Sequence, residues 1–253
     1  MISAFLAELV KLARSTIGRL VTVLLAVAVP VMAAGFFAAA QSDGSSQLAV
    51  KVRPLIHGVG WDAYTGVAGQ VLTVTVLLGV GFVVSWTFGR EFSDQTIESL
   101  VMTRPSRVVL ASGKLAAVLV WAAGVAAAAT MITLGLGLLL SIGPGNPVAG
   151  LARMLAGGVL AAGLGLPFAL VATLGRSALA GVGAVIGVIV TTQILTVLGT
   201  GGWFPYAAPS LWLGMGGPNV SVTPIQLLLV VPVAAAGWAA TALTWQHTEL
   251  TST

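Results

Sequence analysis

Six long apolar stretches separated by short polar breaks dominate the chain. They cover residues 20–40, 66–88, 114–142, 150–174, 178–198 and 224–246. A helix needs about 20 apolar residues to cross the hydrocarbon core of a bilayer. A polar segment at 89–113, the breaker Gly143-Pro144-Gly145-Asn146-Pro147 and the turn Gly175-Arg176-Ser177 mark boundaries between them. The pattern predicts an all-α polytopic membrane protein with six transmembrane helices, forming a single transmembrane domain over residues 1–253.

Residues 1–19, before the first span, have the periodicity of an amphipathic helix. Apolar side chains recur at helical spacing, and polar ones mark the opposite face: Ile2, Phe5, Leu6, Leu9, Ala13 and Ile17 against Glu8, Lys11 and Ser15. We expect an interfacial helix along the membrane surface. The alternative is a helical extension of the first span, although Gly18 offers a natural break.

The composition excludes several classes of protein. Only 7% of the 253 residues are charged and 57% are hydrophobic, whereas a soluble domain needs about 25–35% charged residues on its surface. The basic residues form no stripe or face, so we expect no nucleic-acid partner. Without cysteine there are no disulfides or thiolate metal sites, and His57 and His247 lie far apart. We therefore expect no metal site.

Basic residues are unevenly distributed between alternate loops. One set holds eight and the other three: Lys11, Arg14, Arg19, Arg90, Arg104, Arg107, Lys114 and Arg176 against Lys51, Arg53 and Arg153. The positive-inside rule then predicts that both termini and residues 89–113 are cytoplasmic. Ala38-Ala39-Ala40 resembles a signal-peptide cleavage site, but the apolar run before it is longer than such peptides carry, which favours a retained span.

The spans lack the groups that would power transport or perform catalysis. No ionisable residue lies near the centre of a span, which disfavours an ion-coupled carrier and a membrane enzyme. Ser112-Gly113-Lys114 is not a P-loop, because Val108 and Leu115 replace required residues. Any energy for transport must come from another chain.

Small residues and one amide are the other features of the spans. Gly183 and Gly187 form a G-x-x-x-G, and a second cluster comprises Gly157, Gly158, Ala161, Ala162 and Gly165. These predict close helix packing, within the chain or, alternatively, between subunits. Gln193 is the most polar residue deep in a span; it predicts an interhelical hydrogen bond or, alternatively, a substrate contact.

The segment between the second and third spans predicts a short amphipathic helix. Gly89 ends or bends the second span, and Ser93 or Asp94 can cap the new helix. Its apolar face would contain Ile97, Leu100 and Val101, beside Glu98. Pro105 ends it, and the chain re-enters the membrane at residues 108–110. Such a helix would provide a docking surface for a partner. The alternative is that the segment is a solvated loop whose charges only set the topology.

This segment resembles the cytoplasmic loop of type-2 ATP-binding-cassette (ABC) exporter permeases, especially the short six-span group of the bacitracin and lantibiotic immunity type. The matching residues, in order, are Glu91, Thr96, Glu98, Leu100, Pro105, Arg107 and Lys114. Gln95 replaces the usual glycine, and Pro105 is one residue nearer to Arg107 than is common. Residues 7–12 and 208–213 are also similar to these permeases.

The resemblance implies the membrane subunit of an ATP-driven exporter for a hydrophobic or amphipathic compound, such as an antibiotic, peptide or lipid. It implies a multi-pass protein of the bacterial cytoplasmic membrane, surrounded by lipids and paired with a second copy or a related permease. ATP and Mg would bind to separate ATPase subunits, and this chain would carry no cofactor and no catalytic residue. The ATPase-coupling residues would be Glu91, Ser93, Asp94, Thr96, Ile97, Glu98, Leu100, Arg104 and Arg107. The alternatives are a non-transporting membrane sensor or assembly protein and an ion-coupled carrier.

Residues 199–223, between the last two spans, are rich in aromatic residues, glycine and proline. Trp203, Phe204, Tyr206 and Trp212 are typical of a membrane interface. In the resembling permeases this region forms re-entrant half-helices that close the outer end of the pathway. We therefore expect an extracytoplasmic re-entrant segment whose aromatics, with Gln193, line the pathway or an outer gate; an aromatic belt is the alternative.

Overall fold

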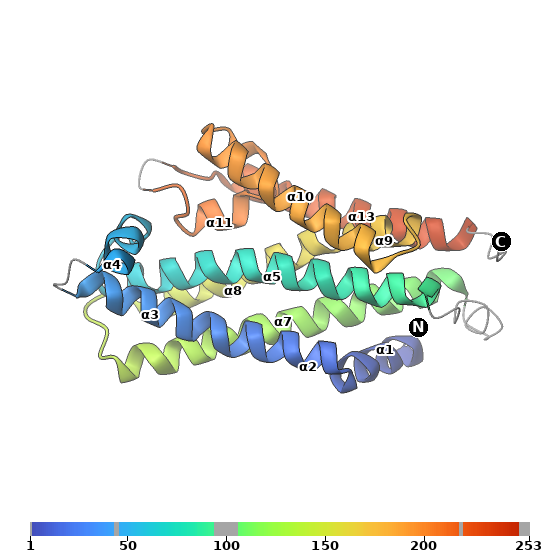
Figure 1. Cartoon of the computed structure of the whole chain (residues 1–253), viewed down its shortest axis with the longest axis horizontal. Coiled ribbons are helices and arrows are strands. Elements are labelled where there is room, and N and C mark those ends of the chain that lie inside the picture. Colours follow the sequence, from blue (N-terminus) through green and yellow to red (C-terminus); the bar gives the residue numbers. More distant parts are fainter. Residues whose placement is uncertain (1, 43–45, 94–105, 218–219, 248–253) are drawn as a thin grey trace.

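The computed structural model describes residues 2–42, 46–93, 106–217 and 220–247. Six helical stretches within this part are long and apolar enough to span a membrane, which confirms the six predicted spans. Their bounds are Thr16–Gln41, Gly60–Ser93, Arg107–Leu139, Pro147–Leu174, Ala178–Val197 and Pro224–His247. Both termini lie at the same end of the bundle (Figure 1).

Three of the spans are interrupted helices. The first consists of α2 (Thr16–Val23), the π-helical turn η1 (Leu24–Ala28) and α3 (Val29–Gln41). The fourth consists of α8 (Pro147–Gly165) and α9 (Phe168–Leu174). Pro167 separates these two because proline has no N–H for the helix ladder. The sixth consists of α12 (Pro224–Leu228) and α13 (Val230–His247).

The remaining spans are single helices: α5 (Gly60–Ser93), α7 (Arg107–Leu139) and α10 (Ala178–Val197). Helix α1 (Ile2–Arg14) precedes the first span. Four short elements lie between spans: α4 (Gln47–Val52), η2 (Arg53–Leu55), η3 (Gly201–Trp203) and α11 (Ala208–Trp212). Two of these short helices, η3 and α11, lie after α10. A re-entrant segment there stays a prediction.

Helix α5 forms the centre of the bundle, and α3, α7, α8, α9 and α10 all pack on it (Figure 1). Its most apolar window is 67% buried, against 17% for α10. The small residues of α8 make this packing close: a Cβ on Gly165 would lie 2.5 Å from a methyl group of Val80. By contrast, a Cβ on Gly183 or Gly187 would have no neighbour within 4 Å. Packing within the chain therefore explains the α8 cluster but not the G-x-x-x-G of α10.

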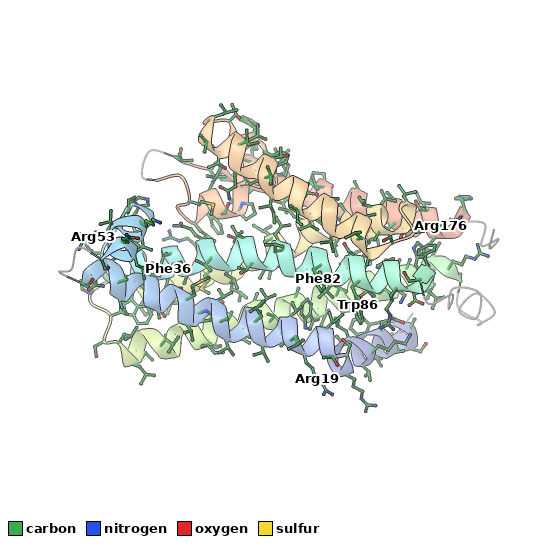
Figure 2. All side chains as sticks on the ribbon, viewed as in Figure 1. Arg19, Phe36, Arg53, Phe82, Trp86 and Arg176 are labelled. Carbon is green, nitrogen blue, oxygen red and sulfur yellow. The ribbon has the colours of Figure 1, made fainter. Side chains whose placement is uncertain are left out.

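Arginines mark both ends of the bundle. Arg19 and Arg176 lie in the half that carries the termini, and Arg53 lies at the opposite end (Figure 2). Arg53 donates hydrogen bonds to the carbonyl oxygens of Ala40 and Ser42. The two labelled arginines of the larger basic set and the one of the smaller set therefore lie at opposite ends of the bundle. Which end faces the cytoplasm stays a prediction from their numbers.

Gly89 is predicted to end or to bend the second span. This residue does not end the second span, because α5 continues without a break to Ser93. A Cβ on Gly89 would lie 2.1 Å from the backbone nitrogen of Ala178. The glycine therefore allows the turn between α9 and α10 to pack directly against α5.

Tryptophan side chains join helices at three other points. Each indole N–H donates to a hydroxyl on another helix: Trp121 to Thr22 at 2.8 Å, Trp238 to Ser112 at 3.3 Å and Trp245 to Thr173 at 3.1 Å. The Trp245 ring also meets that of Phe88 edge-on, at 5.3 Å between centroids. Interhelical hydrogen bonds of this kind supplement van der Waals packing where lipid gives helices no hydrophobic reason to associate.

Candidate functional site

Three charged side chains meet at the end of the bundle that carries both termini. Lys114 of α7 donates to Glu91 Oε1 of α5 at 2.6 Å and to Glu8 Oε2 of α1 at 3.0 Å. Glu8 Oε1 also accepts a hydrogen bond from Lys11 Nζ at 2.7 Å. Glu8, Glu91 and Lys114, here named the charge cluster, thus join three helices that are distant in sequence.

The charge cluster is almost completely removed from water. The exposed fractions are 8% for Glu8, 3% for Glu91 and 1% for Lys114. Buried charges are tolerated when they are paired and hydrogen-bonded. Two carboxylates and the two lysines that contact them give no net charge. Removal of the central ammonium would take from both carboxylates, in a dry site, the cation that pairs with each of them.

The pKa of the Glu8 carboxyl reflects competing influences. Burial raises this pKa, while the positive charges of Lys114 and Lys11 and their hydrogen bonds lower it. The attractions dominate, so the pKa lies below its ordinary value of 4.5. Glu8 therefore stays ionised, as its contacts with two ammonium groups require.

Helix α1 presents its charged carboxylate to the bundle because of how it packs. Ala4, Glu8 and Leu12 recur every fourth residue and form its buried face. A Cβ on Gly113 would lie 3.3 Å from the Cβ of Ala4, so this glycine lets α1 approach α7 beside Lys114. The polar face predicted for this helix thus includes a buried member, Glu8, which lies against α7.

The outward face of α1 is largely apolar. Ile2, Leu6 and Val10 are 77%, 51% and 48% exposed. Ser15 separates α1 from α2, and its hydroxyl accepts the N–H of Gly18 at 2.9 Å. A distinct helix with an apolar outer face fits the expectation of an interfacial helix, and its contact with lipid stays a prediction.

The charge cluster lies at the base of the predicted coupling segment. Glu91 is two residues before the end of α5, and Lys114 is seven residues after the start of α7. Ser93 ends α5, and Arg107, half-buried, begins α7 after the capping residue Ser106. The other predicted coupling residues lie outside the described part of the chain: Asp94, Thr96, Ile97, Glu98, Leu100 and Arg104.

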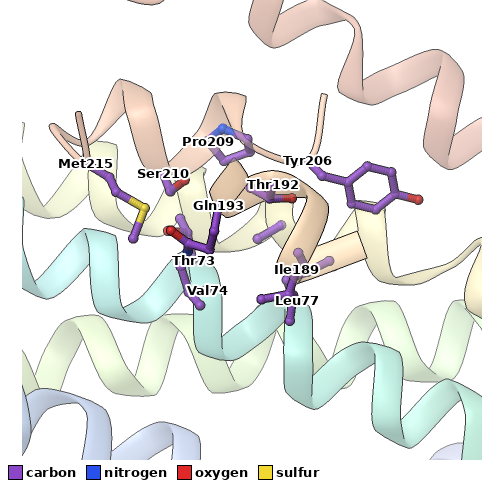
Figure 3. A pocket seen from close by; sticks show the side chains of 11 residues that line it. Thr73, Val74, Leu77, Ile189, Thr192, Gln193, Tyr206, Pro209, Ser210 and Met215 are labelled. Atoms are coloured by element: carbon purple, nitrogen blue, oxygen red, sulfur yellow. The ribbon is translucent and has the colours of Figure 1, made fainter. Parts of the chain in front are cut away.

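The predicted pathway residues are only partly brought together. Gln193 and Tyr206 line the same small cavity, of about 20 Å³ (Figure 3). Phe204 lies beside it, with its ring 5.5 Å from that of Tyr206. Trp203 is 67% exposed, and Trp212 lines a different cavity.

The small cavity is narrow and weakly polar. It lies between α5, α8, α10 and α11, and its hydroxyl groups come from Thr73, Thr192, Tyr206 and Ser210. Burial raises the pKa of Tyr206 to about 12, so its phenol stays protonated. A space of this size holds about one water molecule, so it provides no open route for a larger compound.

The described residues offer no arrangement suited to covalent chemistry. No three His, Cys, Asp or Glu side chains gather there in a way that could hold a metal ion. The charge cluster consists of two carboxylates and one ammonium group, joined by hydrogen bonds. What it can do is hold three helix ends in a fixed relation.

Two members of the charge cluster were not among the predicted site residues. Glu8 carries a detectable signal, because it falls on the same helical face as Ala4 and Leu12. Lys114 belonged to the family pattern, but it was treated as a topological charge. Their meeting across 106 positions of sequence cannot be inferred from local periodicity.

Comparison with protein families gives a match over most of the chain. Residues 4–199 match the family described as ABC-2 family transporter protein. Comparison with individual curated proteins gives no match. The match includes α1, the first five spans and the whole charge cluster. The chain therefore belongs to the ABC-2 transporter family and is a membrane permease subunit of an ABC transporter.

Proposed function

We propose that the chain is the permease of an ATP-driven exporter, and that the charge cluster transmits movement from a separate ATPase to the spans. ATP and Mg would bind to the ATPase, which would dock on residues 94–105. The observation that carries the proposal is the Lys114–Glu91 ion pair, because it links the two helices that enter and leave this segment. A displacement of the segment would then move α5 and α7 together.

The second carboxylate extends the linkage to α1. Glu8 reaches Lys114 from α1, and α1 packs on α7 through Ala4 and Gly113. Because bundle cores are closely packed, small shifts at one end are passed on as movements of whole helices. Helix α5, the centre of the bundle, would carry such a shift to the small cavity at Thr73.

The substrate pathway would lie along α10 and involve a second permease copy or a related permease. The outward side of α10 carries Gly183, Gly187 and Thr191 together with Gln193, all exposed in the single chain. Small residues allow close approach of another helix, and the amide can hydrogen-bond across it. The span centres carry no ionisable residue, which suits a hydrophobic or amphipathic compound such as an antibiotic, peptide or lipid.

ATPase docking can be tested by cross-linking, since the natural chain has no cysteine. Glu98→Cys would be labelled with a photoactivatable cross-linker in membranes of the source organism. We expect capture of a protein with a P-loop, identified by mass spectrometry. The control is Ser221→Cys, an exposed position near the other end of the bundle. Identical capture from both positions would contradict the docking assignment.

Transport and its direction can be tested in inside-out vesicles that contain the permease and the captured ATPase. Bacitracin, nisin and a fluorescent phosphatidylethanolamine serve as probes of the three substrate classes. An exporter would accumulate at least one of them with ATP. ATP hydrolysis without movement of any probe would favour the non-transporting sensor.

A further inference from the structure

A second cavity, distinct from the charge cluster and the small cavity, lies at the end of the bundle away from the termini. Its volume is about 230 Å³, many times the ~30 Å³ that one water occupies in the liquid. It is lined by residues of α5, α8, α11 and the turn after α11, and by His57 from the segment before α5. Its polar or aromatic members are His57, Asp62, Thr65, Gln70, Arg153 and Trp212. We name it the outer cavity.

Two opposite charges lie on the wall of the outer cavity without pairing. Asp62 comes from the first turn of α5, and Arg153 comes from the second turn of α8. No Arg153 nitrogen lies within 4.0 Å of an Asp62 oxygen. Among the described residues, neither side chain has an ion-pair or hydrogen-bond partner. Both are exposed, so a ligand could reach them.

The wall between these charges is fixed by close packing. A Cβ on Gly150 would lie 2.1 Å from Thr65 Oγ1, so α8 and α5 touch at the cavity. Gln70, 5% exposed, donates through Nε2 to the carbonyl oxygen of Leu213 at 3.2 Å and holds the turn after α11 in place. The helices that carry the two charges are therefore packed closely together, and such a rigid scaffold suits a preorganised binding site.

The charges select a class of ligand. One carboxylate and one guanidinium favour a compound that carries both a positive and a negative charge, and they disfavour a compound with a large net charge. A guanidinium matches a phosphate through paired N–H donors, and the half-buried Trp212 indole can accept an ammonium on its face. Asp62 and Arg153 lie about 3 and 9 Å along their spans from the span ends, at the depth of lipid headgroups.

We infer that the outer cavity binds a zwitterion in which a phosphate meets Arg153 and an ammonium meets Asp62. A phosphatidylethanolamine headgroup and soluble phosphoethanolamine share this chemistry. Binding would require neither an ATPase nor transport, so it stands or falls independently of the proposed function.

The test is retention of phosphatidylethanolamine by the full chain, purified in detergent and measured by native mass spectrometry. We expect retention to fall about tenfold or more in Arg153→Gln and in Asp62→Asn, since each removes a charge-assisted contact. Lys51→Gln is the control, because Lys51 is an exposed basic residue at the same end and outside this cavity. Phosphatidylglycerol, which has no ammonium, should bind more weakly than phosphatidylethanolamine and show no dependence on Asp62.

A second arm identifies the source of the ligand. If soluble phosphoethanolamine displaces the lipid from the wild-type chain, the headgroup alone is recognised. If phosphoethanolamine binds with the same dependence on Asp62 and Arg153 but the lipid does not, the ligand is soluble and the site stands. If neither ligand depends on these residues, or Lys51→Gln weakens binding as much as Arg153→Gln, the inference is overturned. Unchanged melting temperatures would show that the variants are folded.

Discussion

Replacement of Lys114 by methionine should severely destabilise the protein. The substitution keeps a long apolar stem but removes the ammonium that lies 2.6 Å from Glu91 and 3.0 Å from Glu8. At an effective dielectric constant of about 20, each attraction is worth ~6 kcal/mol before desolvation is counted. Breaking a buried pair leaves an uncompensated charge and typically costs about 3–5 kcal/mol. We expect a net loss in that range.

The measurement is reversible unfolding in mixed detergent micelles titrated with SDS. A loss of about 3–5 kcal/mol lowers the folded-to-unfolded ratio by roughly 10²- to 10⁴-fold. Lys11→Met is the matched control, because Lys11 contacts the same Glu8 carboxylate but its side chain is 48% exposed. Because the Lys11 ammonium is half-exposed, and Glu8 keeps Lys114 as a partner in this variant, we expect a loss of about 1 kcal/mol or less.

Neutralising the partners should rescue the variant. Glu8→Gln and Glu91→Gln, added to Lys114→Met, remove the stranded charges, so the triple variant should be more stable than Lys114→Met alone. Two outcomes would refute the reasoning. Lys114→Met could unfold at the same SDS concentration as Lys11→Met, or the two glutamine substitutions could add to the damage.

Three further outcomes follow from the packing and the charges. Gly89→Ala should cost about 1–3 kcal/mol because its Cβ would meet the Ala178 backbone, whereas Gly124→Ala, with no neighbour within 4 Å, should be neutral or slightly stabilising in the same titration. Because the folded-state pKa of Glu8 is lowered, its stabilisation is complete above pH 4.5 and is lost as pH falls through that lowered pKa. The stability difference between wild type and Glu8→Gln should therefore be constant above pH 4.5 and shrink below it; a difference that grows on acidification would contradict the assignment. Trp245→Phe should lose about 1 kcal/mol through its hydrogen bond to α9, and Trp fluorescence-detected unfolding with no change in midpoint would argue against that contact.

The sequence predicted some of the site residues well and others poorly, depending on whether their surroundings are set locally or by distant parts of the chain. A family pattern marked Glu91 as a coupling residue; the structure places it near the end of α5, and its role in coupling stays a prediction. Gln193 and Tyr206 do share a cavity, although Trp203 and Trp212 lie elsewhere. The local backbone freedom of Gly89 predicts an end or a bend of the second span, whereas the structure shows a constraint from elsewhere in the chain: the backbone at the start of α10 approaches this glycine closely.

The six spans and their order were determined by the sequence alone. Each depends on about 20 consecutive apolar residues, a local property that the thickness of the bilayer imposes on any chain. The gathering of Glu8, Glu91 and Lys114 was decided only by tertiary structure. A charge at the end of a helix can face lipid, water or a neighbouring helix, and its own sequence does not choose among them. Here the choice depends on the close approach of α1 to α7 at Gly113, which brings residues 106 positions apart into one ion pair.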